Sequence, residues 1–324
     1  MNPIAVIAIG GNSLTRPGER GTFAEQQRNA ELTCRSIADV LDLGYRVVLT
    51  HGNGPQVGQA LLRAELAQPQ LPALGLDECD AETEGEIGYL LQQTLINVLG
   101  ARGRHMGVVS LVTQVLVSSS DPAFRNPTKP IGPFYRMEEA LERQAKLRWT
   151  AIEDSGRGWR RLVPSPQPLE IVEMPAVRAC VHGGLVVIAA GGGGIPVVRE
   201  GSRLRGVDAV IDKDRASALL ARSLHADLLL FSTAVDRVAL HFNRPDEVRL
   251  DQLTSEEAQR YLEDGEFPAG SMGPKIEAAL DYLRAGGRRV VITSPDRLAA
   301  AVMGDGGTEI LPKVREPEPH PAHA

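Results

Sequence analysis

The sequence predicts an α/β fold, in which an open and mostly parallel sheet lies between two layers of helices, an α/β/α sandwich. Short apolar runs alternate along the chain with segments whose apolar residues recur at helical spacing. The short runs are apolar at nearly every position, which is typical of parallel strands covered on both faces. Three of these runs lead directly into glycine-rich corners, within the segments Val6–Leu14, Val47–Gly58 and Val187–Val198.

The strands and helices follow in a regular order. Strands are predicted at Ile4–Ile9, Arg46–Thr50, within Gly107–Val117, and at Leu185–Ala190, Leu228–Ser232 and Arg288–Thr293. Helices are predicted at Glu25–Leu43, Ala81–Leu99, Met174–His182, Lys213–Ser223, Ser255–Glu263, Lys275–Ala285 and Asp296–Met303. Each helix separates two strands or follows the last one, as a sheet built from crossover connections requires.

Two segments interrupt this alternation. Ser118–Tyr135 has four prolines and little periodicity, and it is too long for a plain connection. We therefore predict a lid or a binding loop there, with Arg136–Pro168 forming a small excursion beside it. From Pro312 onward the chain is rich in proline and charge, so this tail is predicted to be disordered.

Composition excludes several classes of function. The chain has 324 residues, of which 43% are hydrophobic and 4% aromatic, and a formal net charge of −6. An acidic chain with few aromatic residues argues against nucleic-acid binding. No apolar run reaches the length of a membrane span, and the first residues do not resemble a signal peptide. Cys34, Cys79 and Cys180 lie far apart, which indicates buried thiols in a reducing compartment and no disulfide or zinc site.

The glycine-rich corners predict an anion site. Ligands of open α/β sheets bind at the carboxyl ends of the strands. A turn without side chains there lets backbone N–H groups approach a phosphate or carboxylate closely. None of the corners matches GxxxxGK[ST] or a strand-linked GxGxxG, which disfavours a Walker-type or dinucleotide site. Turns with a purely steric role are the alternative interpretation.

Three lysines have unusual surroundings. Lys129 lies between prolines, Lys213 begins a predicted helix between two aspartates, and Lys275 follows a Gly-Ser-Met-Gly-Pro run at another helix start. A lone lysine is usually a solvated surface charge. Phosphoryl transfer, however, needs cations that are held in place to neutralise the transferring oxygens. The three rigid contexts therefore favour a functional role.

At this point the sequence resembles the carbamate kinases, a branch of the amino-acid-kinase family. The similarity runs in family order from the first strand to about Leu311, and its most specific segments are "NPTKPIGPFY" and "SMGPK". Further matching segments are "VIAIGGNSL", "THGNGPQVG", "EGEIGYLLQQTL", "WRRLVPSPQP", "GGGGIPVV", "VDAVIDKDRASALLA" and "STAVDRV".

The resemblance implies one domain over residues 1–311, with a protruding lid subdomain at about 118–166. Residues up to about 205 would form the carbamate half, residues 206–311 the nucleotide half, and 312–324 the tail. The implied reaction is reversible phosphoryl transfer between ATP and carbamate, giving ADP and carbamoyl phosphate and running toward ATP in catabolism. It uses Mg²⁺ with ATP or ADP, the metal being carried mainly by the nucleotide phosphates. The family also implies a cytoplasmic homodimer.

The resemblance assigns roles to individual positions. Lys129, Lys213 and Lys275 would act on the phosphates, with Asp214 organising the lysines. The substrate residues would be Gly10, Gly11, Asn12, Gly52, Asn53, Gly54, Gly191, Gly192, Gly193 and Gly194. The nucleotide would lie against Thr233, Ala234, Val235, Met272, Gly273 and Lys275. We expect the four consecutive glycines to leave room that a small planar substrate needs.

Three positions depart from the family pattern, namely Glu84, Glu86 and Ala239. His51 lies beside a substrate glycine, and a packing role is favoured there over acid–base catalysis.

Two other functions remain open from the sequence. One is a sister kinase that acts on an amino-acid carboxylate, and the other is a nucleotide-binding regulator without turnover. The presence of all three lysines and of Asp214 argues against the regulator.

Overall fold

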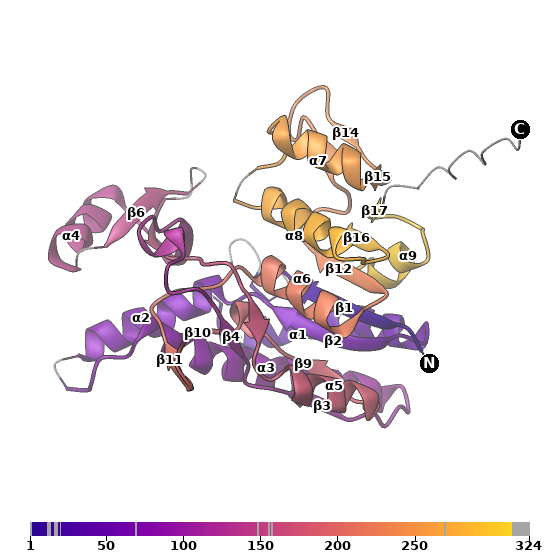
Figure 1. Cartoon of the computed structure of the whole chain (residues 1–324), viewed down its shortest axis with the longest axis horizontal. Coiled ribbons are helices and arrows are strands. Elements are labelled where there is room, and N and C mark those ends of the chain that lie inside the picture. Colours follow the sequence, from indigo (N-terminus) through magenta and orange to yellow (C-terminus); the bar gives the residue numbers. More distant parts are fainter. Residues whose placement is uncertain are drawn as a thin grey trace, which may run out of the picture.

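The computed structural model describes residues 2–11, 14–15, 19, 21–68, 70–147, 149–154, 156, 158–268 and 270–312. Asn12 and almost all of the predicted tail therefore lie outside the described residues. Within them, the central sheet has eight strands in the order β15-β17-β16-β12-β1-β2-β9-β3 (Figure 1). These are β1 Ile4–Ile9, β2 Arg46–His51, β3 Val108–Ser110, β9 Val186–Ile188, β12 Leu228–Ser232, β15 Gln252–Thr254, β16 Val290–Thr293 and β17 Thr308–Leu311.

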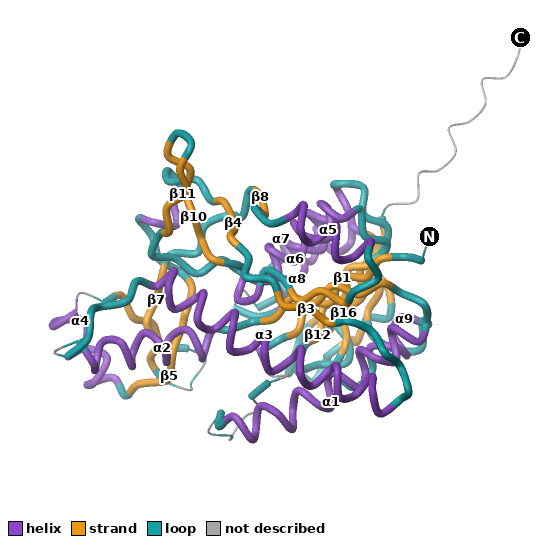
Figure 2. Tube along the Cα trace, turned by 90° about the horizontal axis from the view of Figure 1, so that it is seen from below, coloured by secondary structure: helices purple, strands orange, loops and turns teal. Residues whose placement is uncertain are grey.

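The strand pairs of this sheet are parallel except β16 with β17. Helices cover both faces (Figure 2). One face carries α1 (Phe23–Asp42), α3 (Leu76–Ala101) and α9 (Leu298–Val302). The other carries α5 (Met174–His182), α6 (Lys213–Leu224), α7 (Ser255–Glu263) and α8 (Met272–Arg284). The predicted α/β/α sandwich is confirmed.

Strand β1 is apolar throughout because both of its faces are buried. In β1, Ala5, Ile7 and Ile9 pack into the core beneath α1 and α3. The alternate residues of β1 join the core on the opposite face of the sheet. This two-sided burial follows from the period of two along a strand.

A second structural unit stands away from α7 and α8 (Figure 1). It contains the three-stranded sheet β5-β7-β6 and the helix α4. Its elements are β5 Lys129–Tyr135, α4 Met137–Leu147, β6 Thr150–Glu153 and β7 Trp159–Val163. Helix α2 (Gly54–Ala67) joins it to the core by a close approach, because a Cβ at Gly58 would lie 2.1 Å from Gly132 Cα. Only glycine permits that contact.

The remaining strands form a four-stranded sheet, β11-β10-β4-β8, and a two-stranded sheet, β13-β14. Their bounds are β4 Gln114–Leu116, β8 Glu170–Ile171, β10 Ile195–Glu200, β11 Arg203–Gly206, β13 Ala239–Leu240 and β14 Val248–Arg249. Two 3₁₀ turns, η2 Pro122–Phe124 and η3 Gly191–Gly193, complete the described elements.

Several sequence predictions need correction. Lys129–Tyr135 is a strand, not a loop, and its prolines are tolerated because β5 is an edge strand. Helix α2 was not predicted. Cys34 and Cys79 are buried as expected, whereas Cys180 is partly exposed, and all three thiols are free. Among the described residues, no helix combines the length and apolarity of a membrane span.

Candidate functional site

A cavity of about 910 Å³ lies where the glycine corner after β1 faces α6, α8 and the β5-β7-β6 unit. From the predicted site it gathers Gly10, Gly11, Lys213, Thr233, Ala234, Val235, Met272 and Lys275. These eight predicted residues therefore come together around one space, although they are spread over 266 positions of the chain, from 10 to 275.

Asp214 organises the two lysines of this cavity. Lys213 Nζ donates to Asp214 Oδ1 at 2.5 Å, and Lys275 Nζ donates to Asp214 Oδ2 at 3.2 Å. Lys275 Nζ also donates to the Ser271 carbonyl at 3.2 Å. Burial lowers the pKa of Lys213, and the carboxylate beside it opposes that shift. One buried carboxylate thus holds two ammonium groups at the wall of the cavity.

Lys129 has a different partner. Its Nζ forms an ion pair with Asp212 Oδ2 at 2.9 Å, and it is not among the residues that line the cavity. Asp212 is also the N-cap of α6, where its Oδ1 accepts from the backbone N–H of Asp214 at 2.9 Å. Burial alone would raise the pKa of Asp212, but Lys129 and Lys213 hold it well below its usual range.

The predicted carbamate residues lie beside the cavity. Gly52 and Asn53 connect β2 to α2, which begins at Gly54, and a Cβ at Gly52 would lie 3.2 Å from the Cδ of Lys213. None of these three, and none of Gly191–Gly194, is among the residues that line the cavity. Their predicted contact with substrate stays a prediction.

Close contacts with protein atoms explain the run of four glycines, whereas we expected the run to leave room for the substrate. A Cβ at Gly192 would lie 2.3 Å from the Asn53 amide nitrogen, and one at Gly193 would lie 2.4 Å from the Ile211 carbonyl oxygen. Gly192, Gly193 and Gly194 also have φ values of +68°, +107° and +82°. The run is glycine because protein atoms and a left-handed backbone leave no room for side chains.

His51 packs against the same turn. Its ring is fully buried, and a Cβ at Gly191 would lie 2.2 Å from His51 Nε2. Burial lowers the pKa of His51 to about 4, so the ring is neutral at pH 7. These observations favour the packing role that the sequence suggested.

The cavity wall near Thr233, Ala234 and Val235 contains residues that the sequence did not single out. Phe242 and Phe267 line it together with Ala239, one of the positions that depart from the family pattern. Gly273, by contrast, is not among the lining residues, and a Cβ there would lie 3.2 Å from the Pro268 carbonyl oxygen.

Arg160 is a charged residue of the cavity wall for which the sequence predicted no role. It projects from β7, and its Nε donates to the Gly132 carbonyl at 3.1 Å. The guanidinium lies 5.3 Å from the centre of the Phe134 ring and 3.3 Å from an Asp154 carboxylate oxygen. The segment "WRRLVPSPQP" contains Arg160 and resembles the family, but the resemblance alone assigns no role to its arginines.

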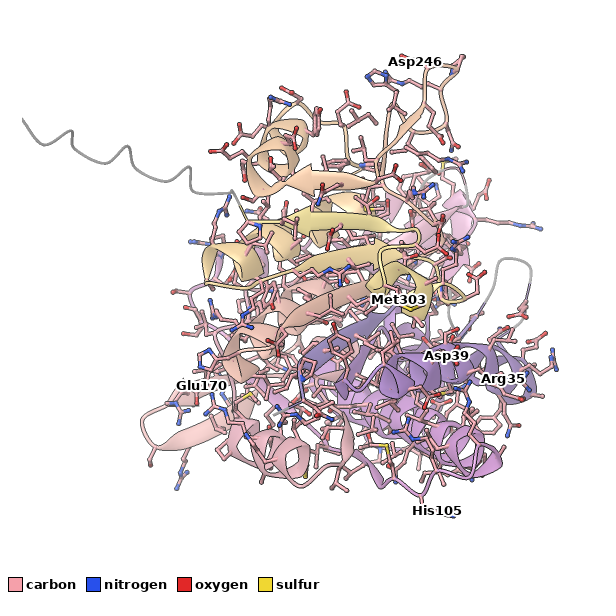
Figure 3. All side chains as sticks on the ribbon, turned by 90° about the vertical axis from the view of Figure 1, so that its right-hand side faces the viewer. Arg35, Asp39, His105, Glu170, Asp246 and Met303 are labelled. Atoms are coloured by element: carbon pink, nitrogen blue, oxygen red, sulfur yellow. The ribbon has the colours of Figure 1, made fainter. Side chains whose placement is uncertain are left out.

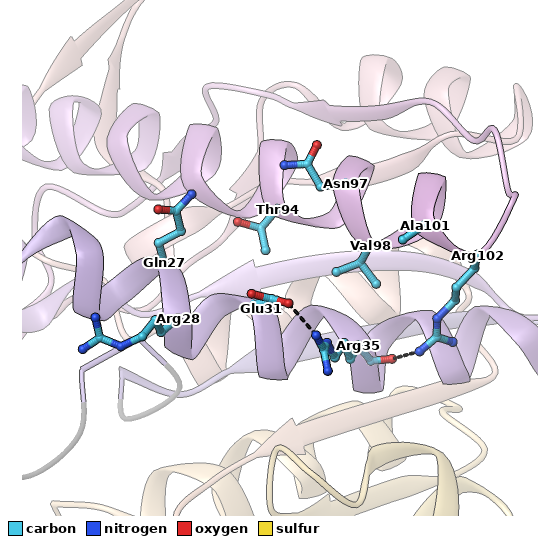
Figure 4. A pocket seen from close by; sticks show the side chains of 9 residues that line it. All are labelled: Gln27, Arg28, Glu31, Arg35, Thr94, Asn97, Val98, Ala101 and Arg102. Atoms are coloured by element: carbon cyan, nitrogen blue, oxygen red, sulfur yellow. Dashed lines mark hydrogen bonds and ion pairs between the residues drawn. The ribbon is translucent and has the colours of Figure 1, made fainter.

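A separate groove of about 570 Å³ lies between α1 and α3 (Figure 4). It contains none of the predicted site residues. Arg35 pairs there with Glu31 at 2.6 Å, and Arg102 pairs with Asp39 at 2.7 Å. Figure 3 places Arg35 and Asp39 close together at the surface of the α1 layer. The cavity lined by Lys213 and Lys275 is larger and gathers the predicted residues, so it is the better candidate site.

Comparison with known proteins identifies the family of the chain. The model of the amino acid kinase family matches residues 3–294. The carbamate kinase of Thermococcus kodakarensis is 47% identical over 309 residues, covering 94% of this chain and 98% of the relative. A carbamate kinase-like protein of Escherichia coli is 47% identical over 315 residues, covering 96% and 99%.

Among solved structures, carbamate kinase from Giardia lamblia bound to AMP-PNP superimposes with a TM-score of 0.89 at 42% identity. That match covers 96% of this chain and 99% of the Giardia chain. The chain therefore belongs to the amino acid kinase family.

Proposed function

We propose that the chain is a carbamate kinase, which transfers a phosphoryl group reversibly between ATP and carbamate to give ADP and carbamoyl phosphate. The observation that carries this proposal is the pair of ammonium groups, Lys213 and Lys275, held by Asp214 at the cavity wall. Phosphoryl transfer depends mainly on positioning and on neutralising the equatorial oxygens. Two cations fixed on one carboxylate supply that neutralisation without reorganisation during the reaction.

The two substrates occupy opposite ends of the cavity in this proposal. The nucleotide lies against Thr233, Ala234, Val235 and Met272, with Lys275 on its phosphates. The transferring group lies at Gly10 and Gly11. The carbamoyl end lies toward residues 52–54 and the 191–194 turn. Carbamate is already an anionic nucleophile, so no residue has to act as a general base.

Arg160 and Lys129 serve the lid side of the site. Arg160 lines the cavity and its Nη2 lies 3.9 Å from the position of a Cβ at Gly54. Lys129 enters from the same unit and reaches the carbamoyl-phosphoryl group once it leaves Asp212. In this proposal residues 118–166 form the lid of the carbamate half, and residues 206–311 form the nucleotide half.

The donor groups of the site fit Mg²⁺ that is bound mainly to the nucleotide phosphates. Both oxygens of Asp214 already accept from lysines. Among the described residues, no group of three or more His, Cys, Asp or Glu side chains is placed to hold a metal ion. When bound, the metal adds further neutralisation of phosphate charge, and the lysines orient the phosphates that carry it.

The chain is further proposed to be a homodimer. The exposed apolar side chains Tyr89 and Ile96 of α3 lie in one groove with Val112, next to β3, the edge strand of the central sheet. An apolar patch beside an unpaired sheet edge is a typical interface. Light scattering should give twice the chain mass, and Ile96→Glu should halve it. Leu66→Glu, on the exposed face of α2, is the matched control and should leave the mass unchanged.

A catabolic, cytoplasmic role that makes ATP from carbamoyl phosphate is supported by the resemblance to carbamate kinases. The decisive experiment is a coupled assay of ATP formation from ADP and carbamoyl phosphate. Lys213→Ala should lower kcat by about 100- to 1000-fold. Lys146→Ala, an exposed lysine of α4, is the matched control. Acetyl phosphate and acyl phosphates of amino acids serve as competing substrates, and a preference for one of them would replace carbamate with a sister carboxylate.

A further inference from the structure

Helix α3 carries a polar stripe inside an otherwise apolar contact surface. Asp80, Thr83 and Glu84 lie three and four positions apart, so they share one face of the helix. Each is 2% exposed or less. Burying a carboxylate is costly unless hydrogen bonds compensate, which raises the question of what these side chains hold.

Glu84 holds the start of the glycine turn. Its Oε1 accepts from the Gly191 N–H at 3.0 Å, and its Oε2 accepts from the Thr113 N–H at 2.9 Å. Thr113 in turn accepts, through Oγ1, from the Ala190 N–H at 3.0 Å. The N–H groups of Ala190 and Gly191 are therefore bound by side chains from two other segments.

The turn needs such support because its first residue is strained. Ala190 has a φ of +50°, in the left-handed region that a residue with a Cβ rarely adopts. A conformation of this kind persists only where the surroundings fix it. The hydrogen bonds that the N–H groups of Ala190 and Gly191 donate to Thr113 and Glu84 provide that fixation.

The other members of the stripe hold the neighbouring loop. Asn53 Nδ2 donates to Asp80 Oδ1 at 2.9 Å and to Thr83 Oγ1 at 3.0 Å. Gly192 packs directly on the Asn53 amide, since a Cβ there would lie 2.3 Å from its nitrogen. One face of α3 thus binds both the loop after β2 and the turn after β9, and it fixes the distance between these two segments.

We infer that Glu84 is a positioning residue for the carbamoyl-phosphate end of the site. By binding the N–H groups of Gly191 and Thr113 it fixes the 190–193 turn against Asn53. The inference rests on the proposed function, which assigns this turn and the 52–54 loop to the carbamoyl end. Glu84 itself touches neither substrate.

A graded set of variants tests the inference. Glu84→Ala removes both acceptors, whereas Glu84→Gln keeps one, because its amide offers a single carbonyl oxygen. We expect Glu84→Ala to raise the KM for carbamoyl phosphate about tenfold or more, with Glu84→Gln between it and the wild type. The KM for ADP should stay within about twofold, because the nucleotide segments do not contact the stripe. Glu86→Ala and Glu86→Gln, at an exposed position of the same helix, are the matched controls.

Amide hydrogen exchange provides a readout that needs no turnover. Glu84→Ala should speed exchange at Gly191 and Thr113 even if the variant is poorly active. Unchanged exchange there, or equal increases in both KM values, would overturn the inference. Faster exchange with an unchanged KM for carbamoyl phosphate would also overturn it, since the turn would then be held without serving the substrate. A wild-type chain that makes no ATP would instead refute the proposed function, and the exchange result would remain interpretable.

Discussion

The two glycine corners at residues 10–11 and 191–194 look alike in sequence and differ in structure. Among the described residues, no atom lies within 4 Å of a Cβ built on Gly11, and Gly11 lines the cavity. A Cβ at Gly191, Gly192, Gly193 or Gly194 would instead lie 2.2 to 2.4 Å from another protein atom. The first corner leaves space for a ligand at Gly11, while a Cβ at Gly10 would lie 2.8 Å from the Ser232 carbonyl oxygen. The second corner is filled by the protein at all four glycines. A glycine-rich turn therefore marks close approach, and only its surroundings tell which partner approaches.

The largest expected effect is on stability at the filled corner. Gly193→Ala places a Cβ against the Ile211 carbonyl and keeps a φ of +107°. Strain and overpacking together should lower the free energy of unfolding by about 2–6 kcal/mol, measured by denaturant titration. Gly201→Ala is the control, because Gly201 has a φ of +61° and no atom within 4 Å among the described residues. Equal losses in the two variants would mean that strain alone explains the glycine.

At the open corner the expected effect is on activity. Gly11→Val puts a side chain into the cavity and should lower kcat/KM about 100-fold by displacing the phosphoryl group. The unfolding free energy should change by less than about 0.5 kcal/mol, because a Cβ at this position meets no described atom within 4 Å and the residue faces the cavity. Steady-state kinetics and thermal unfolding on the same preparation separate the two quantities. A variant with normal kinetics would show that this corner, too, is only structural.

The carboxyl group beneath the filled corner should make stability depend on pH. Burial raises the pKa of Glu84 to about 8, and nearby Glu173 adds to this, while the N–H groups of Thr113 and Gly191 oppose it. His51, which packs on the same turn, is neutral, and buried Asp80 also has a raised pKa. Because the folded state binds the proton more tightly, this contribution to stability is full below pH 4.5 and is lost as pH rises through about 8.

The maximum slope from one such group is about 1.4 kcal/mol per pH unit. Glu84→Gln should remove this part of the decline between pH 4.5 and 8, measured by denaturant titration at a series of pH values. Glu86→Gln should retain the wild-type slope. An identical pH profile in both variants would mean that Glu84 does not titrate differently in the folded and unfolded states.

The smallest effect is expected at a glycine where a side chain would neither clash with protein atoms nor enter the cavity. Gly100 lies near the end of α3, and a Cβ there meets no described atom within 4 Å. Gly100→Ala should raise the free energy of unfolding by up to about 1 kcal/mol through helix propensity, with unchanged kinetics. A destabilised variant would reveal a packing contact outside the described residues.

Elements with strong periodicity could be predicted from the sequence, and those fixed by distant contacts could not. β1 and β12 have the predicted bounds, because burial on both sheet faces leaves a continuous apolar run. α5 and α7 also have the predicted bounds, because their apolar residues recur at helical spacing. α2 begins with Gly54 and Pro55, so its first turn looked like a continuation of a glycine corner. β5 contains prolines, which suit an edge strand and are also typical of loops.

The same distinction holds for the site. Lys213, Asp214 and Lys275 could be predicted because each lies at a recognisable helix start and matches a family segment. The hydrogen bond from Gly191 to Glu84 joins residues 107 positions apart, and no local pattern encodes it. Arg160 likewise depends on how β7 packs beside Gly132. Such contacts follow from the fold, not from spacing along the chain.

The tripeptide Asp212-Lys213-Asp214 connects three distant parts of the protein through consecutive residues. Asp212 binds Lys129 of β5, Lys213 reaches the cavity beside Gly52, and Asp214 binds Lys275 of α8. Each residue of a helix is turned about 100° from the last, so a shift of one position would redirect all three side chains at once. Insertions or deletions within this stretch should therefore be far more damaging than substitutions, and an alignment gap placed there is a reliable sign of a misaligned sequence.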